Sequence, residues 1–187
     1  MMVDAENLML ARIVHCIVKA VAEDVPEYIR DQGKETNNAV IHMRGDCIND
    51  NLRKIVVADG IDLLPFKRYS YDGRILVGRS NKNSYTITTR STLQSIPKKQ
   101  RNSPHFLQSV LYALNGDLEA PVKQTTLIDM TPFDEVTLGD DYASLVGALL
   151  NPSEGYRHYV IVYEANGPEV LNISCEPLDK DFGVVES

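Results

Sequence analysis

The chain has 187 residues, of which 43% are hydrophobic and 24% are charged, and its formal net charge is −7. This composition is typical of a globular protein and argues against a disordered chain. The cysteines stand far apart with no CxxC pair, which excludes a disulfide framework and a zinc knuckle. They are Cys16, Cys47 and Cys175.

The N-terminal part of the sequence predicts helices. Apolar residues at helical spacing indicate a helix from Asp4 to Val25, and a short helix should run from Pro26 to Gly33. A further helix is expected from polar caps at 36–38 to about Ile55. Basic residues interrupt the first apolar run, so it resembles neither a signal peptide nor a membrane span, and we expect a cytoplasmic protein.

The helix expected at 36–55 carries polar residues both on an outer ridge and on its apolar stripe. Four of them form one ridge at a spacing of about one turn: His42, Asp46, Asn49 and Arg53. A histidine beside a carboxylate could act as a general base, whereas the alternative is an exposed face with i,i+4 pairs. Arg44 and Asn51 fall on the apolar stripe instead, so we expect them in a structural polar network.

Charge is segregated along the chain. Residues 66–101, hereafter the basic segment, carry nine Lys or Arg and one acid, Asp72, whereas residues 102–187 carry 14 acids and three Lys or Arg. Short runs of β-branched and aromatic residues in the basic segment predict a three-stranded antiparallel meander. Its first hairpin turn is expected at Asp72-Gly73 and its second at 80–84.

Later residues predict a helix that Ser103 caps and Pro104 begins, and then a strand at 124–130. A helix capped by Asp140 or Asp141 and a hairpin turning at Asn166-Gly167 complete the chain. The fold class is therefore α+β, with N-terminal helices, a central antiparallel meander, and a C-terminal helix and β-hairpin. We expect one domain, with a helical part at 1–58, the basic meander at 60–96 and an acidic part at 102–187.

The basic segment is a candidate nucleic-acid interface, because cations neutralise phosphates and tyrosine rings stack on bases. The candidate residues are Lys67, Arg68, Tyr69, Tyr71, Arg74, Arg79, Lys82, Tyr85, Arg90, Lys98, Lys99 and Arg101. Strand alternation should place Lys67, Tyr69 and Tyr71 on one face of the first strand, and Thr86, Thr88 and Arg90 on one face of the third. The alternatives are plain solvation, pairing with the acidic third of the chain, and docking to a protein.

A metal-independent ribonuclease is the enzymatic alternative, since cations stabilise the phosphorane charge and a His or Tyr transfers protons. Its candidate residues are Arg79, Arg90, His105 and Tyr85. The four histidines have no metal-ligand spacing, so neither a metal nor another cofactor is expected. The acidic third could instead contact a cationic protein partner through Asp129, Asp134, Glu135, Asp140 and Asp141. Pairing of basic and acidic regions between copies would give a homo-oligomer.

Three stretches together resemble an uncharacterised family of small bacterial and phage proteins, over about Thr36 to Cys175. They are TNNAVIHMRGDCINDNL, the meander ending in TITTR, and SPHFLQSVLYALNGDL. The resemblance supplies no catalytic residues, and it implies a setting in host–phage conflict. We therefore expect a non-enzymatic binding or inhibitor protein that acts on a nucleic acid or a nucleoprotein complex such as a defence nuclease, with the ribonuclease or toxin as the alternative.

Overall fold

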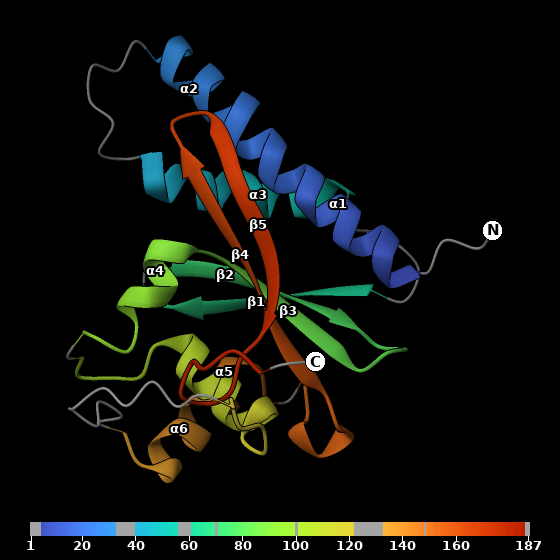
Figure 1. Ribbon diagram of the computed structural model, residues 1–187, viewed down its shortest axis with the longest axis vertical. Coiled ribbons are helices and arrows are strands. Elements are labelled where there is room, and N and C mark those ends of the chain that lie inside the picture. Colours follow the sequence, from blue (N-terminus) through green and yellow to red (C-terminus); the bar gives the residue numbers. More distant parts are fainter. Residues whose placement is uncertain are drawn as a thin grey trace.

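Five strands form one mixed sheet in the computed structural model, which describes residues 5–32, 40–55, 61–69, 71–99, 101–121, 133–147 and 149–185. The strands lie in the order β1-β2-β3-β4-β5, and only β3 and β4 are parallel. Their bounds are Ile61–Arg68, Tyr71–Gly78, Asn83–Thr89, Arg157–Asn166 and Glu169–Pro177. Helices cover both faces of this sheet (Figure 1).

The N-terminal helices pack on one face of the sheet. Their bounds are α1 Ala5–Lys19, the π-helical turn η1 Ala20–Asp24, α2 Val25–Asp31 and α3 Val40–Ile55. Ile13 and Ile17 of α1 recur at helical spacing and meet Leu76 and Tyr85 of the sheet in one apolar cluster.

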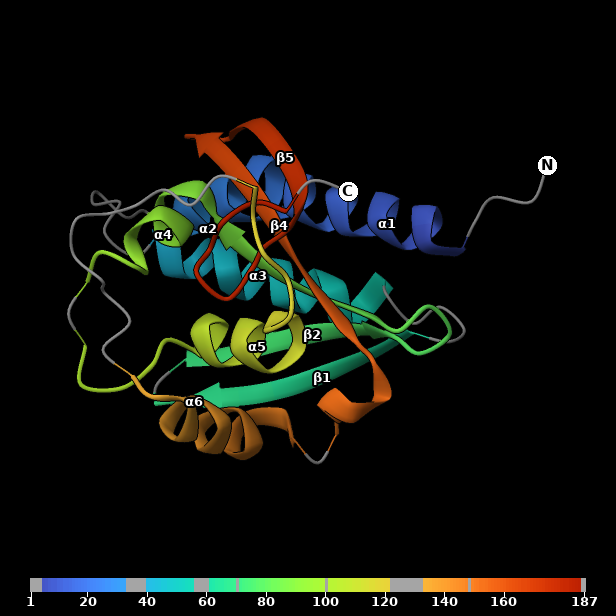
Figure 2. The ribbon, with the colours of Figure 1, turned by 60° about the horizontal axis from the view of Figure 1, so that its bottom comes forward.

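The remaining helices pack on the other face, and Figure 2 shows α5 in front of β2 and α6 below β1. Their bounds are α4 Arg90–Ser95, α5 Phe106–Asn115, α6 Glu135–Tyr142, the π-helical turn η2 Ala143–Gly147 and the 3₁₀ turn η3 Pro152–Glu154. Phe66 and Val162 of the sheet meet Leu107 and Leu111 of α5 in the second cluster. The two clusters on opposite faces confirm an α+β fold with N-terminal helices and a central sheet.

The first hairpin turns at a different place from the one predicted. Arg68 pairs with Tyr71, so the chain reverses between these two residues and not at Asp72-Gly73. Gly73 lies inside β2 opposite Phe66, and a Cβ there would be 2.1 Å from Cζ of the Phe66 ring. The glycine therefore makes room for a core ring and does not form a turn.

Two helix starts also differ from the prediction. α5 is capped by His105, whose Nδ1 accepts from the Leu107 amide, and not by Ser103. α6 is capped by Asp134, whose carboxylate accepts from the Thr137 amide at 2.8 Å, and not by Asp140 or Asp141. The hairpin at Asn166-Gly167 is confirmed, since Gly167 joins β4 to β5 with a φ of 57°. The caps expected at 36–38 and the strand expected at 124–130 lie outside the described residues.

Candidate nucleic-acid interface

Four cations of the basic segment form ion pairs within the chain. Arg68 pairs with Asp141, Lys82 with Glu154, Arg90 with Glu164 and Glu176, and Arg79 with Asp62. All of these acids except Asp62 belong to the acid-rich C-terminal third. In the folded protein, these acids therefore neutralise four of the nine cations of the basic segment.

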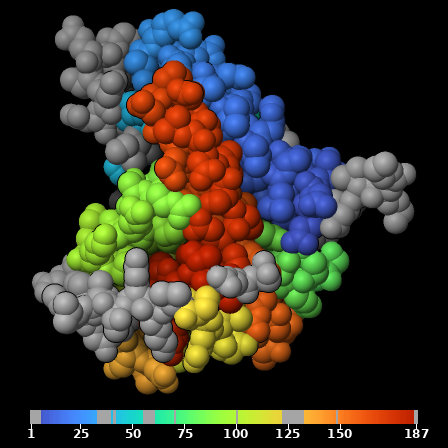
Figure 3. Space-filling view, in the orientation of Figure 1, coloured from blue at the N-terminus to red at the C-terminus, as the bar shows by residue number. Residues whose placement is uncertain are grey.

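Arg90 is the clearest case of such pairing. It begins α4 and does not extend β3, so the prediction that it shares a strand face with Thr86 and Thr88 is wrong. Its guanidinium donates to Glu176 and to the Ser174 hydroxyl on β5, and α4 lies against β5 in Figure 3. Burial acts to raise the pKa of the Glu176 carboxyl, but the hydrogen bonds from Arg90 and Ser174 outweigh it and lower that pKa.

The rings of Tyr85 and Tyr71 are both packed against other side chains, although Tyr71 remains 45% exposed. Tyr85 is 1% exposed on the α1 face of the sheet, where its hydroxyl donates to Glu6. Tyr71 stacks on Phe106 with ring centroids 5.9 Å apart and also contacts Phe66 at 5.9 Å. Both tyrosines therefore belong to packed clusters, and burial raises the pKa of each hydroxyl.

A second group of residues lies at the tip of the β1–β2 hairpin and in the loop before α5, and we call this group the Tyr69 corner. Its members are Arg68, Tyr69, Lys99, Arg101, Ser103 and His105. The hydroxyls of Tyr69 and Ser103 are hydrogen-bonded at 2.9 Å. Arg68 donates to the Pro104 carbonyl at 2.6 Å, and its Cζ lies 5.5 Å from the centroid of the Tyr69 ring. These contacts join the hairpin tip to the loop before α5. Ser103 was missed as a site residue because its place before a proline fits a helix cap equally well.

Tyr69 is the most exposed large side chain among the described apolar and aromatic residues, at 77%. Its φ of 53° is in the left-handed region, which bulky residues rarely adopt. The prediction that Lys67, Tyr69 and Tyr71 share one face is wrong, because cross-strand partners share a face and Lys67 pairs with Asp72 while Tyr71 pairs with Arg68. Lys67 is thus exposed on the α3 side of the hairpin.

Three cations of the corner act electrostatically on His105. Burial lowers the pKa of His105 to about 3, and the positive charges of Arg101, Arg68 and Lys99 act in the same direction. The imidazole is therefore neutral near pH 7. Because Nδ1 accepts from the Leu107 amide at 3.2 Å, the proton of the neutral ring lies on Nε2, which is a hydrogen-bond donor.

Lys99 and Arg101 differ from the four paired cations. Neither forms an ion pair with a described residue, and Lys99 is exposed. The Nε atom of Arg101 is buried and has no hydrogen-bond partner among the described residues. Of the other candidates, Lys98 is exposed next to Lys99, whereas Arg74 donates to the Gly73 carbonyl at 2.9 Å.

The structure does not bring the four candidate catalytic residues together. Arg79 and Arg90 lie beyond opposite ends of β3, a strand of seven residues that spans roughly 20 Å. Tyr85 is buried on the α1 face, whereas His105 caps a helix on the other face. No group of three His, Cys, Asp or Glu side chains suited to a metal ion occurs within the described ranges.

The polar residues of α3 have structural partners. Arg44 donates to the Gly167 carbonyl at 2.5 Å, and Asn51 donates to Asp24 at 2.6 Å. Asn49 donates to the Asp72 carbonyl at 3.3 Å. On the same ridge, His42 and Asp46 are exposed, and Arg53 lies 4.0 Å from Asp50. The helix is therefore tied to the sheet hairpins at Gly167 and Asp72 and to η1 at Asp24, and its outer ridge is solvated.

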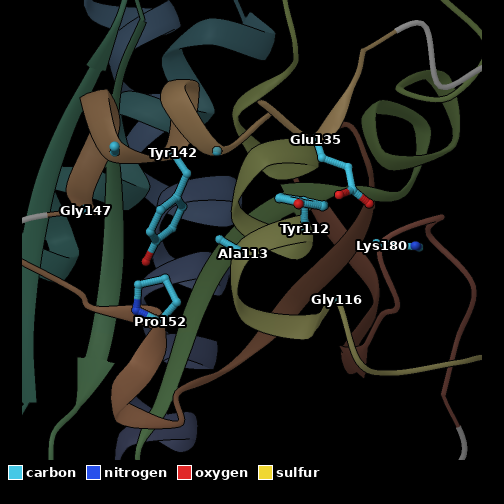
Figure 4. Close-up of a pocket in the computed structure, with 10 residues that line it drawn as sticks. Tyr112, Ala113, Gly116, Glu135, Tyr142, Gly147, Pro152 and Lys180 are labelled. Carbon is cyan, nitrogen blue, oxygen red and sulfur yellow. The ribbon is translucent and has the colours of Figure 1, made fainter. Parts of the chain in front are cut away.

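The acidic residues that were predicted to contact a cationic protein partner differ in their contacts and exposure. Asp141 is used by Arg68, Asp134 caps α6, and Asp140 is exposed, whereas Asp129 lies outside the described residues. Glu135 lines an open groove of about 670 Å³ between α5 and α6. Figure 4 shows Glu135 and Lys180 at one end of this groove, with Tyr142 and Pro152 at the other.

Comparisons with known proteins give one match. The sequence matches a family of unknown function, DUF5986, over residues 4–187. No curated protein and no solved structure matches it. Within the described residues, no helix has the length and apolar character that crossing a membrane requires.

Proposed function

The chain belongs to this family of unknown function, and we propose from the geometry of the Tyr69 corner that the protein binds a nucleic acid, alone or within a nucleoprotein complex, without cleaving it. The observation that carries the proposal is the loop that bears Lys99 and Arg101, which meets the exposed Tyr69 through the hydrogen bond between the Ser103 and Tyr69 hydroxyls. Neither cation forms an ion pair with a described residue, whereas four other cations of the basic segment are paired. Lys98 is exposed next to Lys99 and adds a further positive charge, whereas Lys67 is exposed on the α3 side of the hairpin.

The chemistry of the corner supports a phosphate contact. Lys and Arg that neutralise phosphates release counterions, which drives binding that does not depend on base sequence. The Nε2–H of neutral His105 can add a hydrogen bond to a phosphate oxygen. Arg68, already paired with Asp141, contributes little net charge.

We also propose a biological setting for the protein. The protein would act in the cytoplasm as an inhibitor or accessory protein of phage or mobile-element origin. Glu135 and Asp140 of α6 and its cap Asp134 are exposed and could contact a cationic protein, such as a defence nuclease, while the Tyr69 corner contacts its nucleic acid.

The test is a salt-titrated binding assay with labelled RNA and DNA, followed by a denaturing gel of each sample. We expect affinity that falls as salt rises, with intact product. Replacing Lys99 and Arg101 by Gln should weaken binding and reduce the slope of log K against log salt by about 1 for each phosphate that is no longer neutralised. The matched control replaces Arg53 and Lys54 of α3 by Gln and should bind like the wild type. Cleaved product would support the ribonuclease, and no binding at low salt would contradict the proposal.

A further inference from the structure

We propose that the Tyr69 corner takes single-stranded nucleic acid, with one unpaired base stacked on the Tyr69 ring. This inference rests on the proposed function and names the class of nucleic acid that the same site takes.

The Tyr69 ring is exposed and also held in place. Its hydroxyl is fixed by Ser103 at 2.9 Å, and one side of the ring is approached by the Arg68 guanidinium. Arg68 is itself held by Asp141 and by the Pro104 carbonyl. Because the side chain is 77% exposed, the rest of the ring is open to solvent. A ring whose rotamer is already fixed loses little entropy when a base stacks on it.

The backbone at Tyr69 supports a role in binding. A bulky residue with a φ of 53° is strained, and an Asn or Gly would fit this turn better. Its ring stacks on no described aromatic residue, whereas the ring of the neighbouring Tyr71 contacts Phe66 and Phe106. Strained residues of this kind cluster at ligand-binding sites.

The groups around Tyr69 suit single-stranded nucleic acid. Lys99 and Arg101 can neutralise the phosphates that flank a base on Tyr69, and the sequence-tolerant pairing of aromatic rings with cations is typical of single-strand binding. In a duplex the bases are stacked on each other, so a flat ring on the protein surface cannot reach a base face without unstacking it.

The experiment uses the full-length protein and three labelled DNA probes of about ten nucleotides, a common site size for single-strand binding. The first is a mixed-sequence single strand, the second is the same strand with abasic positions throughout, and the third is the matching duplex. Affinities are measured for the wild type, Tyr69→Ala and Tyr69→Phe. Thermal unfolding of each variant shows that it is folded.

We expect the wild type to bind the single strand about tenfold or more tightly than the abasic strand, since stacking supplies such a factor. Tyr69→Ala should lose that factor on the single strand and be unchanged on the abasic strand, while Tyr69→Phe should keep most of it. If the wild type binds all three probes equally and Tyr69→Ala has no effect, the inference is wrong while nucleic-acid binding stands. If no probe binds at low salt, the proposed function fails and the inference fails with it.

Discussion

The Arg68 guanidinium donates to the carboxylate of Asp141, a residue 73 positions later in the chain. The two side chains are only 16% and 11% exposed. Asp141 also accepts from the Ser109 hydroxyl at 2.5 Å. One partly buried ion pair thus ties the tip of the β1–β2 hairpin to α5 and α6 and supports the loop before α5.

Removing one partner of this pair should destabilise the protein strongly. Asp141→Asn leaves the Arg68 charge with a weaker partner in a poorly solvated position, so we expect the free energy of unfolding to fall by about 3 kcal/mol. Urea denaturation measures this change. The double variant Arg68→Met with Asp141→Leu should recover most of the loss, because neither charge is then buried. A loss below about 0.5 kcal/mol for Asp141→Asn would indicate a solvent-screened surface pair.

Substitution of an ion-paired cation should lower stability, whereas substitution of an unpaired cation should lower nucleic-acid affinity. Arg90→Gln breaks the bonds to Glu176 and Ser174, so it should lower the free energy of unfolding by about 1–2 kcal/mol. It should leave nucleic-acid affinity unchanged after correction for the folded fraction. The Lys99→Gln and Arg101→Gln variants should do the opposite. Measuring both quantities on the same samples checks the assignment, and weaker binding by folded Arg90→Gln would contradict it.

Tyr69 should be replaceable without loss of stability. Glycine adopts a positive φ without strain, so Tyr69→Gly should leave the free energy of unfolding unchanged or raise it by up to about 1 kcal/mol. Nucleic-acid affinity should fall in the same variant. The matched control is Tyr71→Ala, which removes a ring packed on Phe106 and Phe66 and should destabilise the protein by about 2 kcal/mol. Chemical denaturation of both variants gives the comparison, and a clear destabilisation by Tyr69→Gly would mean that the backbone there is not strained.

Stability should depend on pH through His158. The side chain is fully buried between the hydroxyls of Ser84 and Thr86, and burial lowers its pKa to about 3. The unfolded chain therefore takes up a proton near pH 6.5 that the folded chain resists. The stability is fully present above that pH and is lost as the pH falls toward 3, by on the order of 1 kcal/mol per pH unit.

His105 should act in the same direction, since its pKa is also lowered to about 3. His105→Asn keeps a good helix cap and should therefore reduce the slope of stability against pH. Urea denaturation between pH 7 and about pH 5 tests both histidines, because ordinary carboxyl groups titrate mainly below that range. A free energy of unfolding that does not change across this interval would contradict the account.

Local patterns were enough to predict most elements of the fold. Apolar spacing gave α1 and α3, alternating β-branched residues gave the strands, and Asn166-Gly167 gave the last hairpin turn. The position of the first turn was not predictable in this way. The Asp72-Gly73 pair is a common turn motif, but Gly73 is required by the Phe66 ring across the strand, which is a tertiary contact.

The site was predicted only in part for the same reason. Sequence charge identified the basic segment, but it could not show that Arg68 and Arg90 would meet acids more than 70 residues away. The alternation of side chains along a strand does not continue past Tyr69, because the chain turns there. As a result, Tyr71 lies on the opposite face of the sheet from Lys67. The meeting of Tyr69 with Ser103 depends on the packing of the loop before α5.

The most direct measurement is to map where a nucleic acid lies on the protein. A single strand that carries photoreactive pyrimidines is crosslinked to the full-length protein, and the modified peptides are identified by mass spectrometry. We predict crosslinks at Tyr69, at Lys99 and within 101–105, which disappear when Lys99 and Arg101 are replaced by Gln. Crosslinks concentrated on α1 or α3, or crosslinks that persist unchanged in that variant, would contradict the central claim that the Tyr69 corner is the binding site.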